Sequence, residues 1–431
     1  MMKTLKIAVA GLGTVGAGLV KLLSDNAEII ALRAGRRIEV VAVSARDRSR
    51  DRGVAIPASV AWYDDAAKMA DEAECDVVVE VIGGSDGIAR QVVENAIAKG
   101  RHVVTANKAL LAHHGAALAQ AAEDKGVLLA FEAAVAGGIP IIKALKEGLA
   151  GNVISQVTGI LNGTCNYILT TMRETGRDFA DVLGEAQALG YAEADPSFDI
   201  DGIDAAHKLS ILTSLAFGTP VDFASVHVEG IRHVSADDIR FADLLGYRIK
   251  LLGIARMTDH GIEQRVHPCM VPVKTPIATV DGVFNAVVAE GNFVGRSIYE
   301  GRGAGAGPTA SAVAGDIIDI ARGSRVPAFG VPAAALKAQG VASIDRRVGA
   351  YYMRLSVVDR PGVLAEVAAT LRDEGVSVEQ MIQPARSPAD SVPMVMTLHD
   401  TEEAAMNRAV ARISALDAVL EQPRIIRIEA L

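Results

Sequence analysis

Residues 5–16 read LKIAVAGLGTVG, and this stretch decides the fold of the first part of the chain. Its first six residues are mostly apolar, as in a short buried strand, and three glycines follow at the spacing of a dinucleotide-binding turn. Gly11 permits a tight turn, Gly13 lets the backbone approach a pyrophosphate, and Gly16 lets the next helix pack closely. The alternative is a tight turn that binds no ligand.

Strands and helices alternate after this turn. Helical patterns cover 86–99 and 109–124, and the apolar stretches that predict strands are 38–43, 75–84, 101–106 and 127–133. Such alternation favours an α/β fold, with a Rossmann-type, doubly wound parallel sheet covered by helices on both faces.

The middle of the chain has a different pattern. A helix is expected over 137–148 and a strongly apolar helix over 203–217, whereas short strands between 225 and 300 suggest a mixed α+β domain. A second glycine-rich loop, 301–309, precedes a helix over 310–322 that could return the chain to the first domain.

The last 80 residues predict the order βαββαβ, which is the ferredoxin-like arrangement. We therefore expect four parts along the chain. They are a nucleotide-binding domain, a mixed α+β middle domain, a linker and a C-terminal domain, which occupy 1–135 plus about 305–330, 136–304, 331–349 and 350–431 respectively.

Composition excludes several classes of function. The 431 residues are 50% hydrophobic and 4% aromatic, with a net charge of −9, which argues against nucleic acid or an anionic membrane as a partner. Cys75, Cys165 and Cys269 are far apart and form no CxxC motif, so neither a disulfide framework nor a zinc site is expected. The chain starts on a strand rather than a signal-peptide pattern, so a cytoplasmic location is expected.

The end of the second strand bears on the choice of nucleotide. It reads Ser44-Ala45-Arg46-Asp47-Arg48, with no carboxylate at the strand end for a ribose 2′-hydroxyl. Arg46 could instead face a 2′-phosphate, which favours NADP(H) while leaving NAD(H) possible. The alternative is an exposed charged loop without a nucleotide contact.

An acidic stretch with a lysine lies at 190–208, GYAEADPSFDIDGIDAAHK. Asp204 and Lys208 are four residues apart and share one helix face, at the start of an otherwise apolar helix. A desolvated lysine can exchange protons near neutral pH, and the carboxylates just upstream suit a substrate with an ammonium group. The alternative is an ordinary surface ion pair. The upstream carboxylates are Glu193, Asp195, Asp199 and Asp201.

Two further segments are candidates. Lys108 follows a parallel strand at its carboxyl end, where ligands of such sheets bind, although a solvated lysine at a helix start is the alternative. The apolar segment 132–139, EAAVAGGI, could hold a monovalent cation through its carbonyls and Glu132, or could be a plain hinge. His207 is expected to be structural.

Taken together, several of these stretches resemble the homoserine dehydrogenases, and the last 80 residues resemble an ACT domain. The matching segments run in order from residue 7 to about 320: GLGTVG, TANKALLA, FEAAVAGGIPII, GILNGTCNYIL, GYAEADPSFDIDGIDAAHKL and GAGAGPTASAV. The resemblance implies NAD(P)-dependent interconversion of L-homoserine and L-aspartate 4-semialdehyde. It also implies that the middle domain, 136–304, binds the substrate and dimerises, that the protein is a homodimer or homotetramer, and that threonine exerts feedback.

The resemblance also implies roles for particular residues. Lys208 falls at the family's proton donor and acceptor, and Lys108 at a lysine near both substrate and nicotinamide. The other implied positions are Glu193, Asp204 and, beside them, Asp199 for the substrate; Thr14, Val15, Gly190, Glu193 and Gly305 for the nucleotide; and Glu132, Val135, Gly137 and Ile139 for sodium. The competing hypotheses are another NAD(P)-dependent amino-acid dehydrogenase and an amino-acid-sensing protein without activity.

Overall fold

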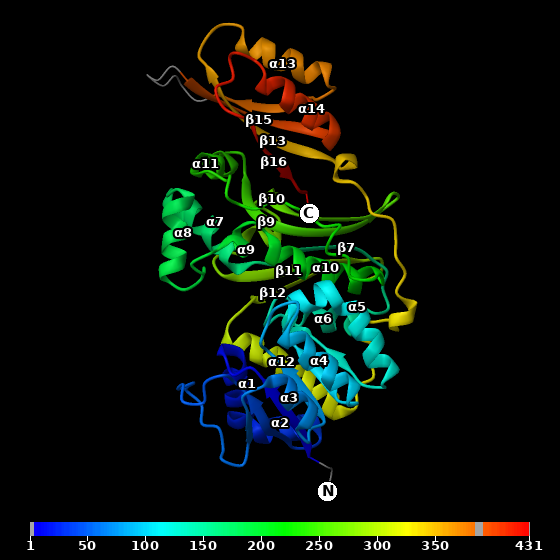
Figure 1. The fold of residues 1–431 in the computed structure, drawn as a ribbon. Helices are drawn as coiled ribbons and strands as arrows, with labels where there is room; N and C mark the ends of the chain where they lie inside the picture. Colours follow the sequence, from blue (N-terminus) through cyan, green and yellow to red (C-terminus); the bar gives the residue numbers. More distant parts are fainter. Residues whose placement is uncertain (1–3, 384–390, 431) are drawn as a thin grey trace.

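The first sheet has six parallel strands. The computed structural model describes residues 4–383 and 391–430, and Figure 1 shows this sheet at the N-terminal end of an elongated molecule. The strand order is β3-β2-β1-β4-β5-β6, which is that of a doubly wound dinucleotide-binding sheet. The strands are β1 (Leu5–Ala10), β2 (Ile38–Ser44), β3 (Ala61–Tyr63), β4 (Val77–Glu80), β5 (His102–Thr105) and β6 (Leu129–Ala130).

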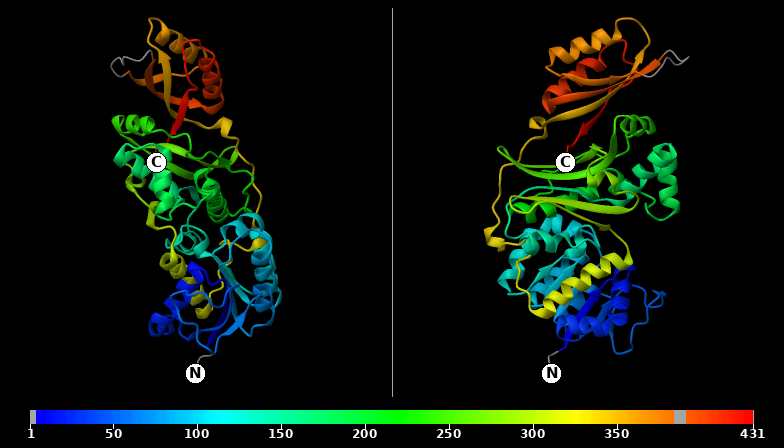
Figure 2. Two further views of the ribbon diagram at one scale, coloured as in Figure 1. Left: turned by 60° about the vertical axis from the view of Figure 1, so that its left-hand side comes forward. Right: turned by 180° about the vertical axis from the view of Figure 1, so that it is seen from behind.

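Helices cover both faces of this sheet because its strands are buried on both sides. Ile7 and Val9 of β1 belong to one apolar core, and Ala8 and Ala10 belong to the other. One face carries α1 (Thr14–Asp25), α2 (Ala27–Ala34) and α12 (Ala306–Arg322), and the other α3 (Ala66–Glu72), α4 (Ile88–Ala98) and α5 (Lys108–Asp124). Figure 2 shows α12, in yellow, lying against the blue helices, so the chain does return to the first sheet.

The second sheet has ten strands and is mostly antiparallel. Its order is β12-β11-β7-β9-β10-β16-β13-β15-β14, and β8 pairs with β10. The strands are β7 (Ile154–Ile160), β8 (His227–Val228), β9 (Tyr247–Thr258), β10 (Gly261–Pro272), β11 (Phe284–Gly291), β12 (Gly295–Arg302), β13 (Val348–Val358), β14 (Val378–Ile382), β15 (Ser391–Glu402) and β16 (Arg424–Ile428).

Helices flank the second sheet along its whole length. Helix α10 packs on β7, β9 and β10, and so carries its residues across the sheet face nearest the first domain. The helices are α7 (Gly163–Thr175), α8 (Phe179–Ala188), α9 (Ser197–Ile200), α10 (Ile203–Phe217), α11 (Ala236–Leu244), α13 (Val363–Asp373) and α14 (Glu403–Ser414).

The predicted order βαββαβ of the last part is confirmed by β13, α13, β14, β15, α14 and β16. The structure adds a contact between domains, because β16 pairs in parallel with β10, with Arg427 opposite Cys269. The ACT-like part therefore shares a sheet with the middle domain instead of standing apart. The domain boundaries stay a prediction.

Several expected elements have other bounds. The expected strand at 127–133 is limited to Leu129–Ala130, and the helix at 137–148 is a short α6 (Ile141–Lys143) continued by a π-helix. Positive φ angles at Ala136 (54°) and Gly137 (45°) bend the backbone between them and prevent a regular element there.

Two other expectations were wrong in length. The strands between 225 and 300 were expected to be short, yet β9 and β10 have 12 residues each because they pair with each other along their whole length. Helix α12 begins at 306 rather than 310, since Pro308 is tolerated in the first turn of a helix. Residues 301–302 of the expected glycine loop end β12.

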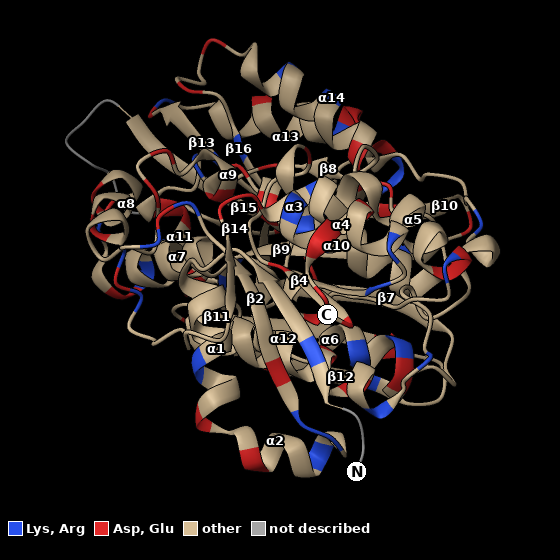
Figure 3. Ribbon diagram, turned by 60° about the horizontal axis from the view of Figure 1, so that its bottom comes forward, with Lys and Arg blue, Asp and Glu red and all other residues tan. Residues whose placement is uncertain are grey.

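Basic and acidic residues are interspersed over the helices around the first sheet (Figure 3). Within residues 4–383 and 391–430, no helix is both long enough and apolar enough to cross a bilayer.

Candidate functional site

Two lysines from different domains share one carboxylate at the centre of the site. Lys208 Nζ donates to Asp204 Oδ2 at 2.7 Å and to the Leu161 carbonyl at 2.8 Å. Lys108 Nζ lies 2.9 Å from the other oxygen, Asp204 Oδ1. The side chain of Lys108 is 34% exposed, whereas those of Lys208 and Asp204 are 10% and 5% exposed. An ammonium group therefore lies at the mouth of the site, and another lies beneath it.

Lys108 is held by the end of the first sheet. It begins α5, and the preceding Asn107 caps this helix by accepting from the Leu110 amide at 3.0 Å. The Asn107 amide also donates to the Gly84 carbonyl at 2.7 Å, which ties the helix start to the end of the neighbouring strand. Lys108 thus lies at the carboxyl edge of the parallel sheet, as its position in the sequence predicts.

The charges of these groups depend on one another. Burial opposes ionisation of Asp204, but Lys208 and Lys108 outweigh it and hold the pKa of Asp204 well below its usual range. Burial lowers the pKa of Lys208, with the charge of Asp204 acting against this effect and that of Lys108 adding to it. A lysine whose pKa is lowered in this way is suited to exchange a proton.

Asn162, which has no predicted role in the sequence, completes this cluster. Its Nδ2 donates at 2.8 Å to both Asp199 Oδ1 and Asp204 Oδ2, and its Oδ1 caps α7 by accepting from the Cys165 amide. Asn162 follows β7 by two residues, and its place just after a strand is the signal that could have identified it.

The other predicted carboxylates divide into two groups. Asp199 is partly buried beside Asn162, and burial, with the charge of Asp204, raises its pKa. Glu193 is exposed, and its charge, like that of Asp199, acts on Lys108. Asp195 instead accepts from the Ser197 amide, and Asp201 pairs with Arg232, so these two lie outside the cluster.

A cavity of about 740 Å³ lies beside the glycine turn. A side chain at Gly16 would overlap the Gly11 carbonyl oxygen, which explains the close approach of α1, whereas the space around Gly13 is open. The cavity is lined by Gly11, Leu12, Gly13, Ser44, Ala45, Arg46, Asp47, Arg50, Arg52, Asp64, Asp65, Ala66, Val81, Ile82 and Ile88.

An adjoining cavity of about 370 Å³ extends from Gly13 and Thr14 to Ala306. It joins the first turn of α1, which carries Thr14 and Val15, to that of α12, which follows Gly305. Two helix N-termini therefore lie at the same cavity, and both favour an anionic group.

Arg46 is exposed and lines the larger cavity, as the sequence suggested. Arg50 and Arg52 line it too, although no motif in the sequence points to them. Arg52 donates to the Leu12 carbonyl at 3.2 Å, and both Arg48 and Arg52 lie 5.3 Å from the Trp62 ring centre. Only the fold reveals that this charged loop turns back over the glycine turn.

The candidate cation loop at 132–139 lies where the two domains meet. The Glu132 carboxylate accepts from the amides of Ile142 and Lys143 at 2.9 and 2.8 Å, so it caps the next helix. Burial, with the charge of Asp316, raises the pKa of Glu132 to about 7. The Glu132 carboxylate is thus already used to accept from backbone amides. The carbonyl oxygens of the loop therefore remain as candidate cation ligands.

His207 packs among aromatic rings, 4.3 Å from Phe223 and 5.4 Å from His113 between ring centres. Burial, with the charge of His113, lowers its pKa to about 4, so the ring is neutral at pH 7. This environment agrees with the structural role expected for His207.

A histidine, a cysteine and a glutamate do come together elsewhere. Potential metal-ligand atoms of His267, Cys269 and Glu429 lie within 4.8 Å of one another. Arg265, however, donates to His267 Nε2 at 2.9 Å and to Glu429 at 2.7 Å. The buried Arg265 guanidinium thus already occupies His267 and Glu429, and its positive charge opposes metal binding there.

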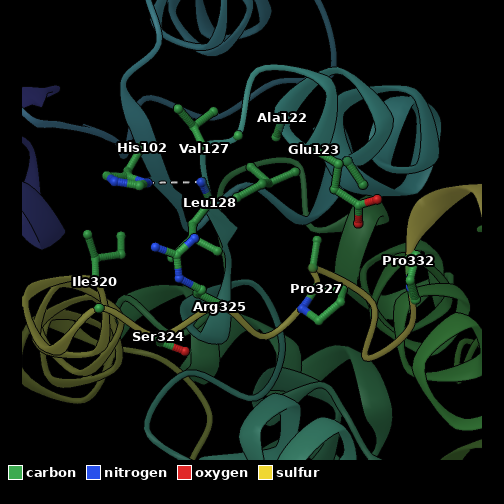
Figure 4. Close-up of a pocket in the computed structure, with 15 residues that line it drawn as sticks. His102, Ala122, Glu123, Val127, Leu128, Ile320, Ser324, Arg325, Pro327 and Pro332 are labelled. Carbon is green, nitrogen blue, oxygen red and sulfur yellow. Dashed lines mark hydrogen bonds between the residues drawn. The ribbon is translucent and has the colours of Figure 1, made fainter.

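Another sizeable cavity, of about 440 Å³, lies at the opposite edge of the first sheet (Figure 4). Its lining includes His102, which begins β5 and accepts from the Leu128 amide at 2.9 Å, and Arg325 in the segment after α12. Ligands of parallel sheets bind at the carboxyl edge, so this cavity is not the expected nucleotide site.

Comparisons with known proteins give one consistent family. A family model described as the NAD binding domain of homoserine dehydrogenase matches residues 11–132. A second model, described as homoserine dehydrogenase, matches residues 140–318, and the ACT domain model matches residues 351–417. The homoserine dehydrogenase of Neisseria gonorrhoeae is 49% identical over the full length of both chains.

Solved structures agree with this result. A homoserine dehydrogenase from Thiobacillus denitrificans has a TM-score of 0.93 and 47% identity, covering 100% of this chain and 99% of that one. A hyperthermophilic archaeal homoserine dehydrogenase in complex with NADPH has a TM-score of 0.64 and 28% identity, covering 75% of this chain and 99% of that one.

Proposed function

The chain belongs to the homoserine dehydrogenase family, and we propose that Lys208 exchanges the proton in its NAD(P)-dependent interconversion of L-homoserine and L-aspartate 4-semialdehyde. The observation that carries this proposal is the Asp204 carboxylate shared by a buried and a half-exposed lysine. The nicotinamide, when bound, supplies or accepts the hydride at C4 of the substrate.

In the direction of reduction, Lys208 donates a proton to the C4 oxygen as negative charge develops there. In the direction of oxidation, the neutral amine removes that proton. Asp204 fixes the position of the Lys208 ammonium, and the Leu161 carbonyl fixes it from a second side. Lys108 holds the other oxygen of Asp204 and would lie near the substrate and the nicotinamide when both are bound.

The substrate's ammonium group is proposed to bind at the carboxylates beside this pair. Asp204 already has both lysines and Asn162 as partners, so Asp199 and Glu193 supply the less committed negative charge. Holding the ammonium here turns C4 toward Lys208 and the cofactor. Asn162 keeps Asp199 and Asp204 at a fixed separation.

The chemistry is tested by following NADPH oxidation with L-aspartate 4-semialdehyde, beside other semialdehydes and oxo acids. A substrate other than the semialdehyde with a higher kcat/KM would favour a different amino-acid dehydrogenase. Absence of NADPH oxidation with every compound would favour an amino-acid sensor without activity.

We further propose a preference for NADP(H). Gly11, Gly13, Thr14 and Val15 would hold the pyrophosphate side, with Gly190 and Gly305 also at the nucleotide. Arg46, Arg50 and Arg52 would face a 2′-phosphate in the 740 Å³ cavity. The archaeal relative solved with NADPH supports this preference. Equal KM values for NADPH and NADH would refute it.

Sodium is proposed to bind the backbone of 132–139, at the carbonyls of Glu132, Val135, Gly137 and Ile139. The support is the unusual backbone at Ala136 and Gly137, both with positive φ, a conformation that is strained for alanine. The Ile139 carbonyl also accepts from the Ile141 amide at 2.8 Å, which leaves its second lone pair for a cation. Exchange of sodium for a bulky organic cation is expected to lower thermal stability.

The ACT domain is proposed to convey feedback by threonine. Arg427 on β16 donates to both oxygens of Glu229 at 2.9 Å. Two residues later, the Ile231 amide donates to the Ile200 carbonyl at 2.8 Å, at the end of the helix that carries Asp199. A chain of contacts thus connects the ACT domain to the carboxylates of the site.

Arg427→Met tests this route in the full-length enzyme. It is expected to weaken threonine inhibition while leaving uninhibited turnover within a few-fold of wild type. Unchanged inhibition would exclude the route. A truncation at 345 is less informative, because it removes β16 from the edge of β10 and leaves Arg265 buried without Glu429.

A homodimer or homotetramer is also proposed. Val153, Phe293 and Ile298, around the edge of the second sheet, are 69%, 89% and 42% exposed and would be covered if a second copy of the chain bound there. Sedimentation velocity would give the state directly. The cytoplasmic location stays a prediction, to be checked by cell fractionation.

A further inference from the structure

Asn285 is a buried residue whose side-chain amide makes no hydrogen bond to the described residues. It is 1% exposed, and neither its Nδ2 nor its Oδ1 has a partner in the described part of the chain. An asparagine amide can donate two hydrogen bonds and accept two, and leaving such a group unpaired in the interior is unfavourable. Buried polar groups without partners are rare and call for an explanation.

The position of Asn285 suggests what it serves. It is the second residue of β11 and pairs with Gly301 of β12. The next residue, Ala286, pairs with Ile160, which precedes Leu161, whose carbonyl accepts from Lys208. Leu161 and Val287 belong to the apolar core that also contains the buried residues of α10. Asn285 alternates in step with Val287, so its side chain lies on the sheet face that carries the catalytic helix.

The amide directly contacts the loop that leads into α12. A side chain at Gly303 would overlap the amide atoms of Asn285, so the backbone of this loop lies against them. On the other side, the Gly138 amide donates to the Arg302 carbonyl at 3.0 Å, and a side chain at Gly137 would overlap the Gly303 carbonyl. The loop is therefore confined between the second sheet and the hinge between domains.

We propose that Asn285 is a positioning residue for the cofactor, whose amide pairs with the backbone of residues 303–305 when the nucleotide is bound. This inference rests on the proposed function, which assigns Gly305 to the nucleotide. A peptide group offers one donor and one acceptor, which match the two unpaired atoms of Asn285. Because Gly303 has no side chain, its peptide groups lie close enough to the Asn285 amide for a small rotation to bring them into hydrogen-bonding geometry.

This role differs from a structural one in its effect on the ligand-free protein. A structural asparagine stabilises the protein without ligand, whereas Asn285 makes no hydrogen bond there. Asn285→Leu keeps the branched shape of the side chain and removes both unpaired polar atoms, so it is not expected to destabilise the ligand-free protein. The energetic effect of the substitution should therefore appear only with the cofactor.

The matched control is Asn166, which is also 1% exposed but is fully paired. Its Nδ2 donates to the carbonyls of Val280 and Phe284 at 3.0 and 3.1 Å, and its Oδ1 accepts from Lys250 at 3.2 Å. Asn166→Leu removes these bonds. It is expected to lower the unfolding temperature without ligand and to leave NADPH affinity unchanged.

The test measures thermal unfolding with and without NADPH, the Kd for NADPH by fluorescence titration, and steady-state kinetics for wild type and both variants. For Asn285→Leu we expect an unfolding temperature without ligand no lower than that of wild type. We also expect about tenfold weaker NADPH binding from the loss of two hydrogen bonds, a smaller NADPH-induced stabilisation, and a raised KM for NADPH with that for the semialdehyde little changed.

Wild-type NADPH affinity in Asn285→Leu would overturn the inference, as would a ligand-free protein destabilised like Asn166→Leu. Asn285→Ala is the second variant, and failure of both to fold would also overturn it, because it would show a structural role. Failure of the proposed function is distinguishable, since wild type itself would then neither bind nor oxidise NADPH.

Discussion

Replacement of Lys208 by methionine removes the proposed proton donor while keeping most of the side-chain volume. Lys208 contacts Asp204 and Leu161 and does not line the nucleotide cavity, so that cavity should be unaffected. A positioned acid or base contributes about 10²- to 10⁴-fold to rate, or about 2.7–5.4 kcal/mol of barrier at 1.36 kcal/mol per tenfold. We expect kcat to fall by that factor, with the Kd for NADPH unchanged.

The stability of the variant can be worked from the same contacts. Removing one member of a buried ion pair costs about 3–5 kcal/mol when the other charge is left alone. Here Asp204 keeps Lys108 and Asn162 as partners, so about 1–3 kcal/mol is expected. Domains of this kind are stable by about 5–15 kcal/mol, so the variant should fold, and thermal unfolding measures the loss.

Lys250 provides a control, because it too is a buried lysine paired with a carboxylate, but its partners belong to other segments than those of Lys208. Its Nζ donates to the Val280 carbonyl at 2.6 Å and to Asp281 at 2.9 Å. Lys250→Met should be destabilised at least as much, with kcat within a few-fold of wild type. Turnover of Lys208→Met within a few-fold of wild type would refute the assignment, whatever its stability.

Three further outcomes are expected. Burial lowers the pKa of Lys208, so kcat for reduction should fall as the pH rises through that lowered pKa, whereas kcat for oxidation should rise. If Lys208→Met kept both of these pH dependences, they would belong to another group. Asn162→Ala should lower kcat/KM for the semialdehyde about tenfold. Asn162→Ser keeps an oxygen that can cap α7 but loses the hydrogen bond to Asp199, so it separates the two effects. Arg46→Ala should raise the KM for NADPH about tenfold and leave that for NADH unchanged, and an equal change for both would argue against contact with a 2′-phosphate.

Local sequence was sufficient to predict features that lie within a single turn, helix or strand. The glycine turn at 11–16 predicted a strand, a turn and a helix, because each glycine allows a close backbone approach that depends only on residues nearby in the sequence. The spacing of Asp204 and Lys208 predicted their pairing, because residues four apart share a helix face. The order βαββαβ followed from periodicity in the same way.

Periodicity failed where distant segments decide the geometry. The length of β9 and β10 depends on their pairing with each other, and the bend at Ala136 and Gly137 depends on the close approach of Gly303. The role of Asn162 was missed because its partners, Asp199 and Asp204, are 37 and 42 residues away. No local pattern encodes such contacts.

The sequence by itself determined the classes of its elements and the parallel nucleotide-binding sheet, and it predicted that Asp204 and Lys208 share one helix face. These follow from steric limits and side-chain spacing within one element. Only the tertiary structure decided that Lys108 reaches the Asp204 of another domain, that Arg50 and Arg52 turn over the glycine turn, and that β16 extends the second sheet. Each of these depends on burial and charge pairing between segments far apart in the chain, which exist only once the chain is packed.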